Sequence, residues 1–189
     1  MKYEAIVIGV SAGGLNALKT ILPTLPHDFK IPVIIVQHEH ASSDDFLAHY
    51  LNDRCMLTVI QADEKIKISS GNVYLAPPNY HLLVEDDKTF SLSIDEHVNY
   101  ARPSIDVLFE TASEAYGNKL IGIILTGANS DGSIGLKEIK KRGGLTIVQE
   151  PSKAEVATMP SAAISATQVD YILPLEEIGP FLCKLEENL

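Results

Sequence analysis

One short run of this sequence could carry a nucleophile for acyl-transfer chemistry. Gly9-Val10-Ser11-Ala12-Gly13 is a G-x-S-x-G run that directly follows the apolar segment Ala5–Ile8. A buried strand, a tight glycine turn and an immediately following helix form the setting that a nucleophilic serine needs. Glycines let the backbone turn sharply, and the free N–H groups at the helix start lie where an oxyanion could develop.

The same run admits two other interpretations. Serine is a preferred N-cap residue, so Ser11 could simply begin a helix. A nucleotide site fits less well, because Gly9, Gly13 and Gly14 do not follow the G-x-G-x-x-G spacing and no G-K-[ST] is present.

Two further apolar segments are each followed by a residue that could act with Ser11. His38 comes directly after Val33–Gln37, and Asp131 lies in the glycine-containing stretch after Leu120–Leu125. Because parallel strands end at one edge of a sheet, we expect the three side chains to share that edge. They are the types required for a nucleophile, a proton shuttle and an orienting acid, and triads are defined by geometry rather than by chain order.

The histidine and the aspartate also have plainer interpretations. His38 and His40 form an H-x-H pair that could bind a metal, although the remaining ligand spacing of zinc motifs is missing. His38 could equally be a structural histidine at a strand end. Asp131 precedes Gly132 and a helical pattern, so it could only cap that helix.

The elements that must position these residues alternate between strand and helix, which predicts an α/β fold with a mostly parallel sheet. The predicted strands are Ala5–Ile8, Val33–Gln37, Leu57–Ile60, Val73–Ala76, Leu120–Leu125, Thr146–Gln149 and Asp170–Leu173. The predicted helices are Leu15–Leu22, Phe46–Leu51, Ser104–Tyr116, Gly135–Lys141, Pro160–Ala166 and Leu175–Leu185. The stretch His81–Ile94 predicts an antiparallel hairpin added at one edge of the sheet.

Composition places the chain among ordinary globular proteins. Its 189 residues are 46% hydrophobic and 21% charged, so we expect a single domain over residues 1–189. No apolar stretch is long enough to span a membrane, and the net charge of -10 without a basic block argues against nucleic acid or membrane as a partner. The absence of a signal-peptide layout and the two distant cysteines, Cys55 and Cys183, predict a cytoplasmic protein with reduced thiols.

Several ordered motifs extend across almost the whole chain. They are Gly9-Val10-Ser11-Ala12-Gly13-Gly14, Val36-Gln37-His38, Tyr74-Leu75-Ala76-Pro77, Arg102-Pro103-Ser104-Ile105-Asp106-Val107-Leu108-Phe109, Ile124-Leu125-Thr126-Gly127, Ser130-Asp131-Gly132, Gly135 and Met159-Pro160. In these motifs the chain resembles the catalytic domain of the bacterial chemotaxis methylesterases, which demethylate glutamyl methyl esters on chemoreceptors. The resemblance implies a doubly wound, mostly parallel sheet flanked by helices, with no metal and no cofactor.

The resemblance also implies roles for individual residues. It makes Ser11 the nucleophile, His38 the general base and Asp131 the orienting carboxylate. It also makes the backbone N–H of Ala128 a donor to the oxyanion. From the residues themselves, we expect the N–H groups near Ala12 to bind the oxyanion as well. Arg102 would either orient a substrate carboxylate or backbone or form a surface ion pair. The implied partner is a methyl-accepting chemoreceptor or a similar signalling protein, and glutamine deamidation is a second implied activity because amide and ester share acyl chemistry.

The sequence departs from the family pattern near the proposed site. Glu39-His40 replace the usual Met-Pro after the histidine, Ala101 replaces a histidine, and Ala128 replaces a methionine. These changes leave open a serine esterase that acts on another protein or a small-molecule ester, while a non-catalytic scaffold is disfavoured by the intact triad positions. Because Met1 lies only a few residues before the first strand, we also expect no receiver domain and no regulation by phosphorylation within this chain.

A basic stretch is the remaining candidate for a docking surface. Lys137, Lys140, Lys141 and Arg142 cluster on one predicted helix and could attract an acidic receptor segment. An ordinary solvated helix face explains the same charges more simply.

Overall fold

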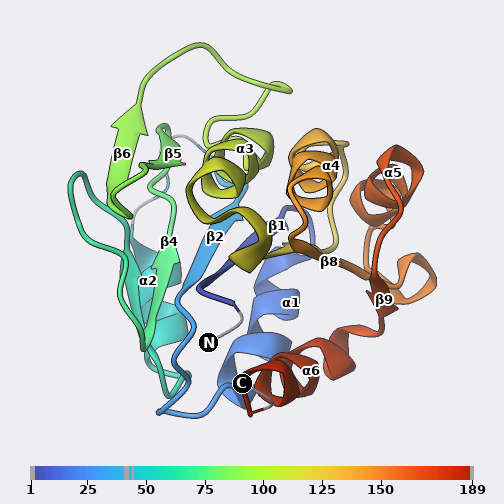
Figure 1. Ribbon diagram of the computed structural model, residues 1–189, viewed down its shortest axis with the longest axis horizontal. Helices are drawn as coiled ribbons and strands as arrows, with labels where there is room; N and C mark the ends of the chain where they lie inside the picture. The colour runs from blue at the N-terminus through green and yellow to red at the C-terminus, as the bar shows by residue number, and fades with distance from the viewer. Residues whose placement is uncertain (1–2, 41–42, 44, 188–189) are drawn as a thin grey trace.

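The computed structural model describes residues 3–40, 43 and 45–187, which fold around one seven-stranded parallel sheet (Figure 1). The strands are β1 (Ala5–Val10), β2 (Val33–Gln37), β3 (Thr58–Gln61), β4 (Asn72–Leu75), β7 (Leu120–Ile124), β8 (Leu145–Gln149) and β9 (Tyr171–Leu173). Their order across the sheet is β3-β4-β2-β1-β7-β8-β9. The central strands β1, β2 and β7 are apolar and buried almost throughout, as expected for a parallel sheet covered on both faces.

Helices cover both faces of this sheet, so the fold is doubly wound. One core cluster joins the sheet to α1 (Gly14–Ile21), α2 (Phe46–Asn52) and α6 (Leu175–Glu187). A second cluster joins the opposite face to α3 (Ile105–Tyr116), α4 (Ser133–Lys141) and α5 (Thr158–Ala166). Short 3-10 helices lie at Leu22–Thr24, Gly117–Lys119 and Pro151–Lys153. The predicted α/β class and each predicted strand and helix are confirmed, with ends that differ by a few residues.

The predicted hairpin is present as β5 (His81–Val84) and β6 (Phe90–Ser93), but its two strands pair with each other in a separate sheet. It packs beside β4, where the Phe90 ring meets the Tyr74 ring edge-on at 5.0 Å between centroids. The hairpin predicted at one edge is therefore confirmed, and it forms a two-stranded sheet of its own there. Apolar packing against β4 and α3 holds the hairpin in place, together with backbone hydrogen bonds that join residues 65–68 to residues 88–90.

The order of the strands brings three loops to one point. β1 lies between β2 and β7, with Val10 beside Gln37 on one side and Gly9 beside Ile124 on the other. The chain passes from β1 to β2 on one side and reaches β7 on the other. Crevices at such a switch in strand order, outside the carboxyl ends of the strands, are where open α/β sheets bind ligands.

Two glycines make the turns at this edge possible. Gly13, which precedes α1, has a φ of 80°, and Gly132, which precedes α4, has a φ of 89°. A Cβ atom at position 132 would also lie 2.5 Å from Ile105 Cγ2 and from Ile124 Cδ1. The loops that carry Ser11 and Asp131 therefore depend on glycine for both conformation and space.

No helix among the described residues is both long enough and apolar enough to cross a membrane.

Candidate active site

Ser11 and His38 lie side by side where β1 and β2 end. They directly follow the register pair Val10 and Gln37, and the His38 N–H donates to the Val10 carbonyl at 3.0 Å. On the other side of β1, the Ser11 N–H donates to the Thr126 carbonyl at 3.0 Å. Hydrogen bonds thus fix the backbone of the serine between the loops that follow β2 and β7.

A side-chain hydrogen bond at the centre of the site joins His38 to Asp131. His38 Nε2 lies 2.8 Å from Asp131 Oδ2, with 13% of the histidine side chain and none of the aspartate side chain exposed. The carboxylate also accepts hydrogen bonds from the Ser104 hydroxyl and from the backbone N–H groups of Ile105 and Asp106, at 2.8, 2.6 and 3.2 Å. The carboxylate therefore caps the N-terminus of α3 and orients the imidazole at the same time.

These contacts keep Asp131 ionised. Burial alone raises the pKa of this carboxyl group, but hydrogen bonds from His38, Asn99 and the Ile105 N–H outweigh burial and hold the pKa below its ordinary value. A charged, buried and oriented carboxylate beside Nε2 is able to stabilise an imidazolium during catalysis.

Asn99 links this carboxylate to a second buried one. Its Nδ2 atom lies 2.8 Å from Asp131 Oδ1 and 2.7 Å from Asp106 Oδ2. Asp106 also accepts the Gly135 N–H at the start of α4, yet burial dominates and raises the pKa of Asp106. The Asn99 amide therefore bridges two carboxyl groups whose pKa values shift in opposite directions. Through this bridge, the loop before α3 is connected to the candidate site.

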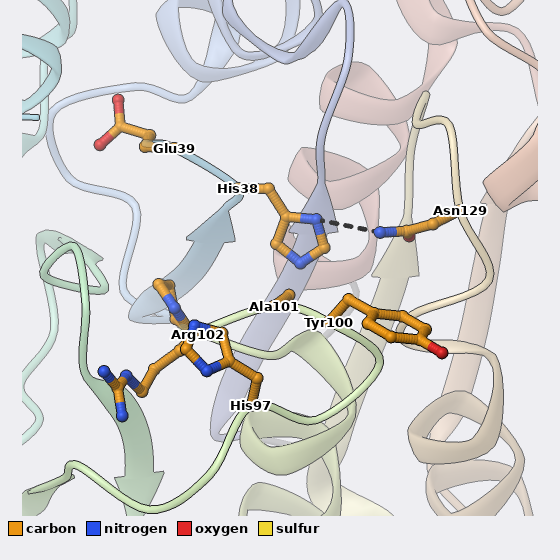
Figure 2. A pocket seen from close by; sticks show the side chains of 8 residues that line it. His38, Glu39, His97, Tyr100, Ala101, Arg102 and Asn129 are labelled. Carbon is orange, nitrogen blue, oxygen red and sulfur yellow. Dashed lines mark hydrogen bonds between the residues drawn. The ribbon is translucent and has the colours of Figure 1, made fainter. Parts of the chain in front are cut away.

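The other imidazole nitrogen faces Asn129. Asn129 Nδ2 lies 3.5 Å from His38 Nδ1, the contact drawn as a dashed line in Figure 2. Asn129 Oδ1 accepts the Asp131 N–H at 3.1 Å, which directs the amide group of this side chain toward the imidazole. A donor at Nδ1 and a carboxylate at Nε2 together favour the tautomer with its proton on Nε2 and its lone pair on Nδ1.

The Ser11 hydroxyl is not bonded to the imidazole in this structure. Among the described residues, no hydrogen bond joins Ser11 Oγ to His38, although the two residues end neighbouring strands. Catalytic hydrogen bonds are often formed only once substrate is bound, so this geometry is compatible with a serine nucleophile. The structure thus brings His38 and Asp131 into contact and places Ser11 beside them without a direct bond.

Backbone donors are available beside the serine. Ala12 and Ala128 are both exposed, and neither N–H donates to an acceptor within the part of the chain that the structure describes. The Thr126 hydroxyl, which accepts the Val156 N–H, donates to the Ala12 carbonyl at 2.9 Å and so holds the loop after β1. Two unused N–H groups near a candidate nucleophile are the components of an oxyanion hole.

A cavity of about 200 Å³ opens beside the imidazole. Its lining residues are His38, Glu39, His97, Tyr100, Ala101, Arg102, Pro103 and Asn129 (Figure 2). Glu39 points away from the imidazole in this view, whereas the small side chain of Ala101 leaves space near it. Two of the three departures from the family pattern therefore line the cavity, and the third, at Ala128, adjoins Asn129.

Arg102 holds the loop that forms the cavity wall. Its guanidinium points away from His38 and donates to Asn79 Oδ1 and to the carbonyls of Ile94 and Asp95. No carboxylate pairs with it among the described residues, so the surface ion pair considered for Arg102 is absent there.

Several residues of this site were missed by the sequence analysis. Asn129 stood only two positions before Asp131 and could have been singled out from the loop after β7. His97, Tyr100 and Asn99 carry no local signal, because they reach the site through a loop that begins far away in the sequence. Within the described ranges, no group of three or more His, Cys, Asp or Glu side chains is arranged to hold a metal ion. Cys55 and Cys183 are free, and burial raises the pKa of Cys55 to about 11, so that thiol is not an activated nucleophile.

Comparison with known proteins assigns the chain to a family. Residues 6–182 match the family model described as CheB methylesterase. A Leptospira interrogans protein, provisionally named protein-glutamate methylesterase/protein-glutamine glutaminase, is 63% identical over 188 residues that cover 100% of this chain and 97% of that protein. Protein-glutamate methylesterase FrzG of Myxococcus xanthus is 37% identical over 95% of this chain and 54% of its own length.

The fold agrees with this assignment. The crystal structure of the Thermotoga maritima CheB methylesterase catalytic domain superposes with a TM-score of 0.93 at 34% identity, covering 98% of this chain and 100% of that one. Sequence and structure together show that the chain belongs to the CheB methylesterase family.

Proposed function

We propose that this protein is a serine hydrolase that converts glutamyl methyl esters of a chemoreceptor or similar signalling protein to glutamate and methanol. The observation that carries the proposal is the contact between the buried Asp131 carboxylate and His38 Nε2, directly beside the strand end that bears Ser11. The names of the relatives, protein-glutamate methylesterase and protein-glutamine glutaminase, support the same acyl chemistry. Deamidation of glutamine is therefore a second activity of the proposed site.

The first half of the reaction forms an acyl-enzyme. On substrate binding, the Ser11 hydroxyl turns to His38 Nδ1, which takes its proton while Oγ attacks the ester carbonyl. Asp131 stabilises the resulting imidazolium through Nε2. The carbonyl oxygen becomes an oxyanion and accepts hydrogen bonds from the N–H groups of Ala12 and Ala128, each worth about 3 kcal/mol in the transition state.

The second half releases the products. The Nδ1 proton of His38 passes to the methoxy oxygen, the bond between carbonyl carbon and oxygen breaks, and methanol leaves. A water molecule then gives a proton to Nδ1 and attacks the acyl carbon. The tetrahedral intermediate collapses, Ser11 Oγ recovers the proton from His38, and the glutamate side chain is released.

The net charge of -10 does not attract an acidic partner. The basic stretch on α4 also offers little unpaired positive charge for such a partner. Three of its four cations are engaged in ion pairs, namely Lys140 with Asp170, Lys141 with Glu138 and Arg142 with Glu114. The solvated helix face is thus the better account of this stretch, and we place docking at the cavity beside His38.

The direct test is methanol release from a methylated receptor by the wild-type protein and by Ser11→Ala. We expect release by the wild type, no measurable release by the variant, and the same thermal unfolding for both. A fluorophosphonate probe should label the wild type at Ser11 and leave the variant unlabelled. Turnover by Ser11→Ala at the wild-type rate would reject the proposed nucleophile, and labelling without methanol release would favour an esterase for another substrate.

A further inference from the structure

The Asn129 side chain has a fixed orientation at the reacting nitrogen of the site. Its Oδ1 accepts the Asp131 N–H at 3.1 Å, so its Nδ2 is the atom 3.5 Å from His38 Nδ1 (Figure 2). The two hydrogens of an amide nitrogen are donors only, and this side chain therefore presents a donor to whatever approaches Nδ1.

The leaving group of the proposed reaction must approach that same nitrogen. If Nδ1 is the base that deprotonates Ser11, it is also the acid that protonates the departing atom, which then lies within about 3 Å of Nδ1. Asn129 Nδ2 lies 3.5 Å from Nδ1, and Asn129 lines the cavity from which substrate would enter. The departing atom and the Asn129 amide are thus brought into contact.

An ester and an amide respond differently to this donor. In the tetrahedral intermediate, the methoxy oxygen has two lone pairs, so one accepts the His38 proton while the other accepts an N–H of Asn129. The amide nitrogen has a single lone pair at that stage, which the His38 proton takes. The departing nitrogen then has no lone pair left to accept a hydrogen bond from Asn129, and its own N–H groups face the Asn129 N–H. A donor without an acceptor in a half-buried site raises the free energy of that state.

We infer that Asn129 is a specificity-determining residue that favours a methyl ester over a glutamine amide at the Ser11 site. The inference rests on the proposed function and deepens it, since it assigns the preferred leaving group. It concerns a contact with the departing atom itself, which distinguishes it from the support that Asn129 Oδ1 gives to Asp131.

Two substitutions separate these roles. Asn129→Asp keeps an oxygen for the Asp131 N–H and replaces the donor by an acceptor, which suits the N–H groups of a departing amide. Asn129→Ala removes both functions. Ser130→Ala is the matched control, because Ser130 is the exposed neighbour in the same loop. Its backbone carbonyl accepts the Ser133 N–H, and its hydroxyl makes no hydrogen bond to the residues that the structure describes.

The experiment uses two receptor peptides that differ only in carrying glutamyl methyl ester or glutamine at one position, with methanol and ammonia release as readouts. The ratio of kcat/KM for ester to kcat/KM for amide should fall about tenfold in Asn129→Ala, the factor for one hydrogen bond. It should fall further in Asn129→Asp and stay within twofold in Ser130→Ala. Loss of the support for Asp131 would slow both reactions alike and leave the ratio unchanged.

The outcomes that overturn the inference differ from those that overturn the proposed function. A ratio within twofold of the wild type in both Asn129 variants, a rise in that ratio, or no ammonia release by either variant would reject the role of Asn129. Failure of the wild type to release methanol from the ester peptide and from methylated receptor would instead reject the proposed function.

Discussion

Asp131 contacts the Nε2 atom of His38, at 2.8 Å, and leaves Nδ1 as the nitrogen that faces the cavity and Asn129. In the familiar serine-protease arrangement the acid binds Nδ1 and the serine uses Nε2. Here the two nitrogens exchange roles. Hydrogen bonding to the N-terminus of α3 holds Asp131 beside Nε2, so Nδ1 is the nitrogen left for the serine. The base of the proposed mechanism is accordingly Nδ1.

Replacing the carboxylate should abolish most activity. In Asp131→Asn, one of the two oxygens becomes an NH2 group, which would oppose donors that now point at the carboxylate. We expect kcat to fall by about 10⁴-fold, as for loss of the orienting acid in other triads, and stability to fall by about 3 kcal/mol. Methanol release and denaturant unfolding measure the two effects. Asp87→Asn, at an exposed turn, is the matched control, and a kcat within tenfold of wild type would contradict the role of Asp131.

Loss of the bridging amide should affect catalysis through the position of Asp131. In Asn99→Ala, neither Asp131 nor Asp106 receives its hydrogen bond from Nδ2, so the two carboxylates repel each other without an intervening donor. Because small misplacements in an active site are costly, we expect kcat to fall by about 10- to 100-fold with KM within about twofold. Steady-state kinetics on the ester peptide test this. A change in KM alone would show that Asn99 acts on binding instead.

The guanidinium of Arg102 should be irreplaceable by lysine. Its three nitrogens donate to Asn79 and to two backbone carbonyls, whereas an ammonium cannot reach all of these acceptors with one rigid group. We expect Arg102→Lys to reduce the free energy of unfolding by about 1–2 kcal/mol and to raise KM several-fold. Arg54→Lys, just after α2, controls for the loss of one exposed guanidinium, since the Arg54 guanidinium donates to the Tyr50 carbonyl and stacks on the Tyr50 ring at 3.8 Å. Equal stability of both variants would contradict this account.

An acid-dependent contribution to stability is expected from Asp170. Burial alone raises the pKa of Asp170, but the ion pair with Lys140 and hydrogen bonds from Thr146 outweigh burial and lower the pKa. A carboxyl group whose pKa is lowered by folding stabilises the fold above its unfolded pKa, and this contribution is lost as the pH falls through its folded pKa. Asp170→Asn should therefore be less stable than wild type by about 1 kcal/mol near pH 7, with a difference that shrinks below about pH 4.

Denaturant unfolding of both proteins across this pH range provides the measurement. A stability difference that stays constant down to the lowest pH would show that the carboxylate charge is not its source. Asp28→Asn, which changes an exposed aspartate in the loop before β2, controls for the loss of one negative charge.

Much of this protein could be predicted from its sequence because the relevant patterns are local. Short apolar runs identified β1, β2 and β7, and the residues after them identified Ser11, His38 and Asp131 as a set at one sheet edge. The family resemblance, now shown, followed from motifs that are contiguous in the chain. Such elements can be predicted locally because the apolar periodicity of a strand or a helix is set by residues that are close together in the chain.

The tertiary structure alone decided how these residues contact one another. Asn99 lies 32 positions before Asp131, and Asn129 lies 91 positions after His38, so no local pattern relates them. Long-range packing likewise decides which imidazole nitrogen contacts the carboxylate. It also decides that the hairpin forms a sheet separate from the main one. Side-chain pairing follows from strand register and from the docking of α3 against the sheet, both of which arise only when distant segments bury their apolar faces together.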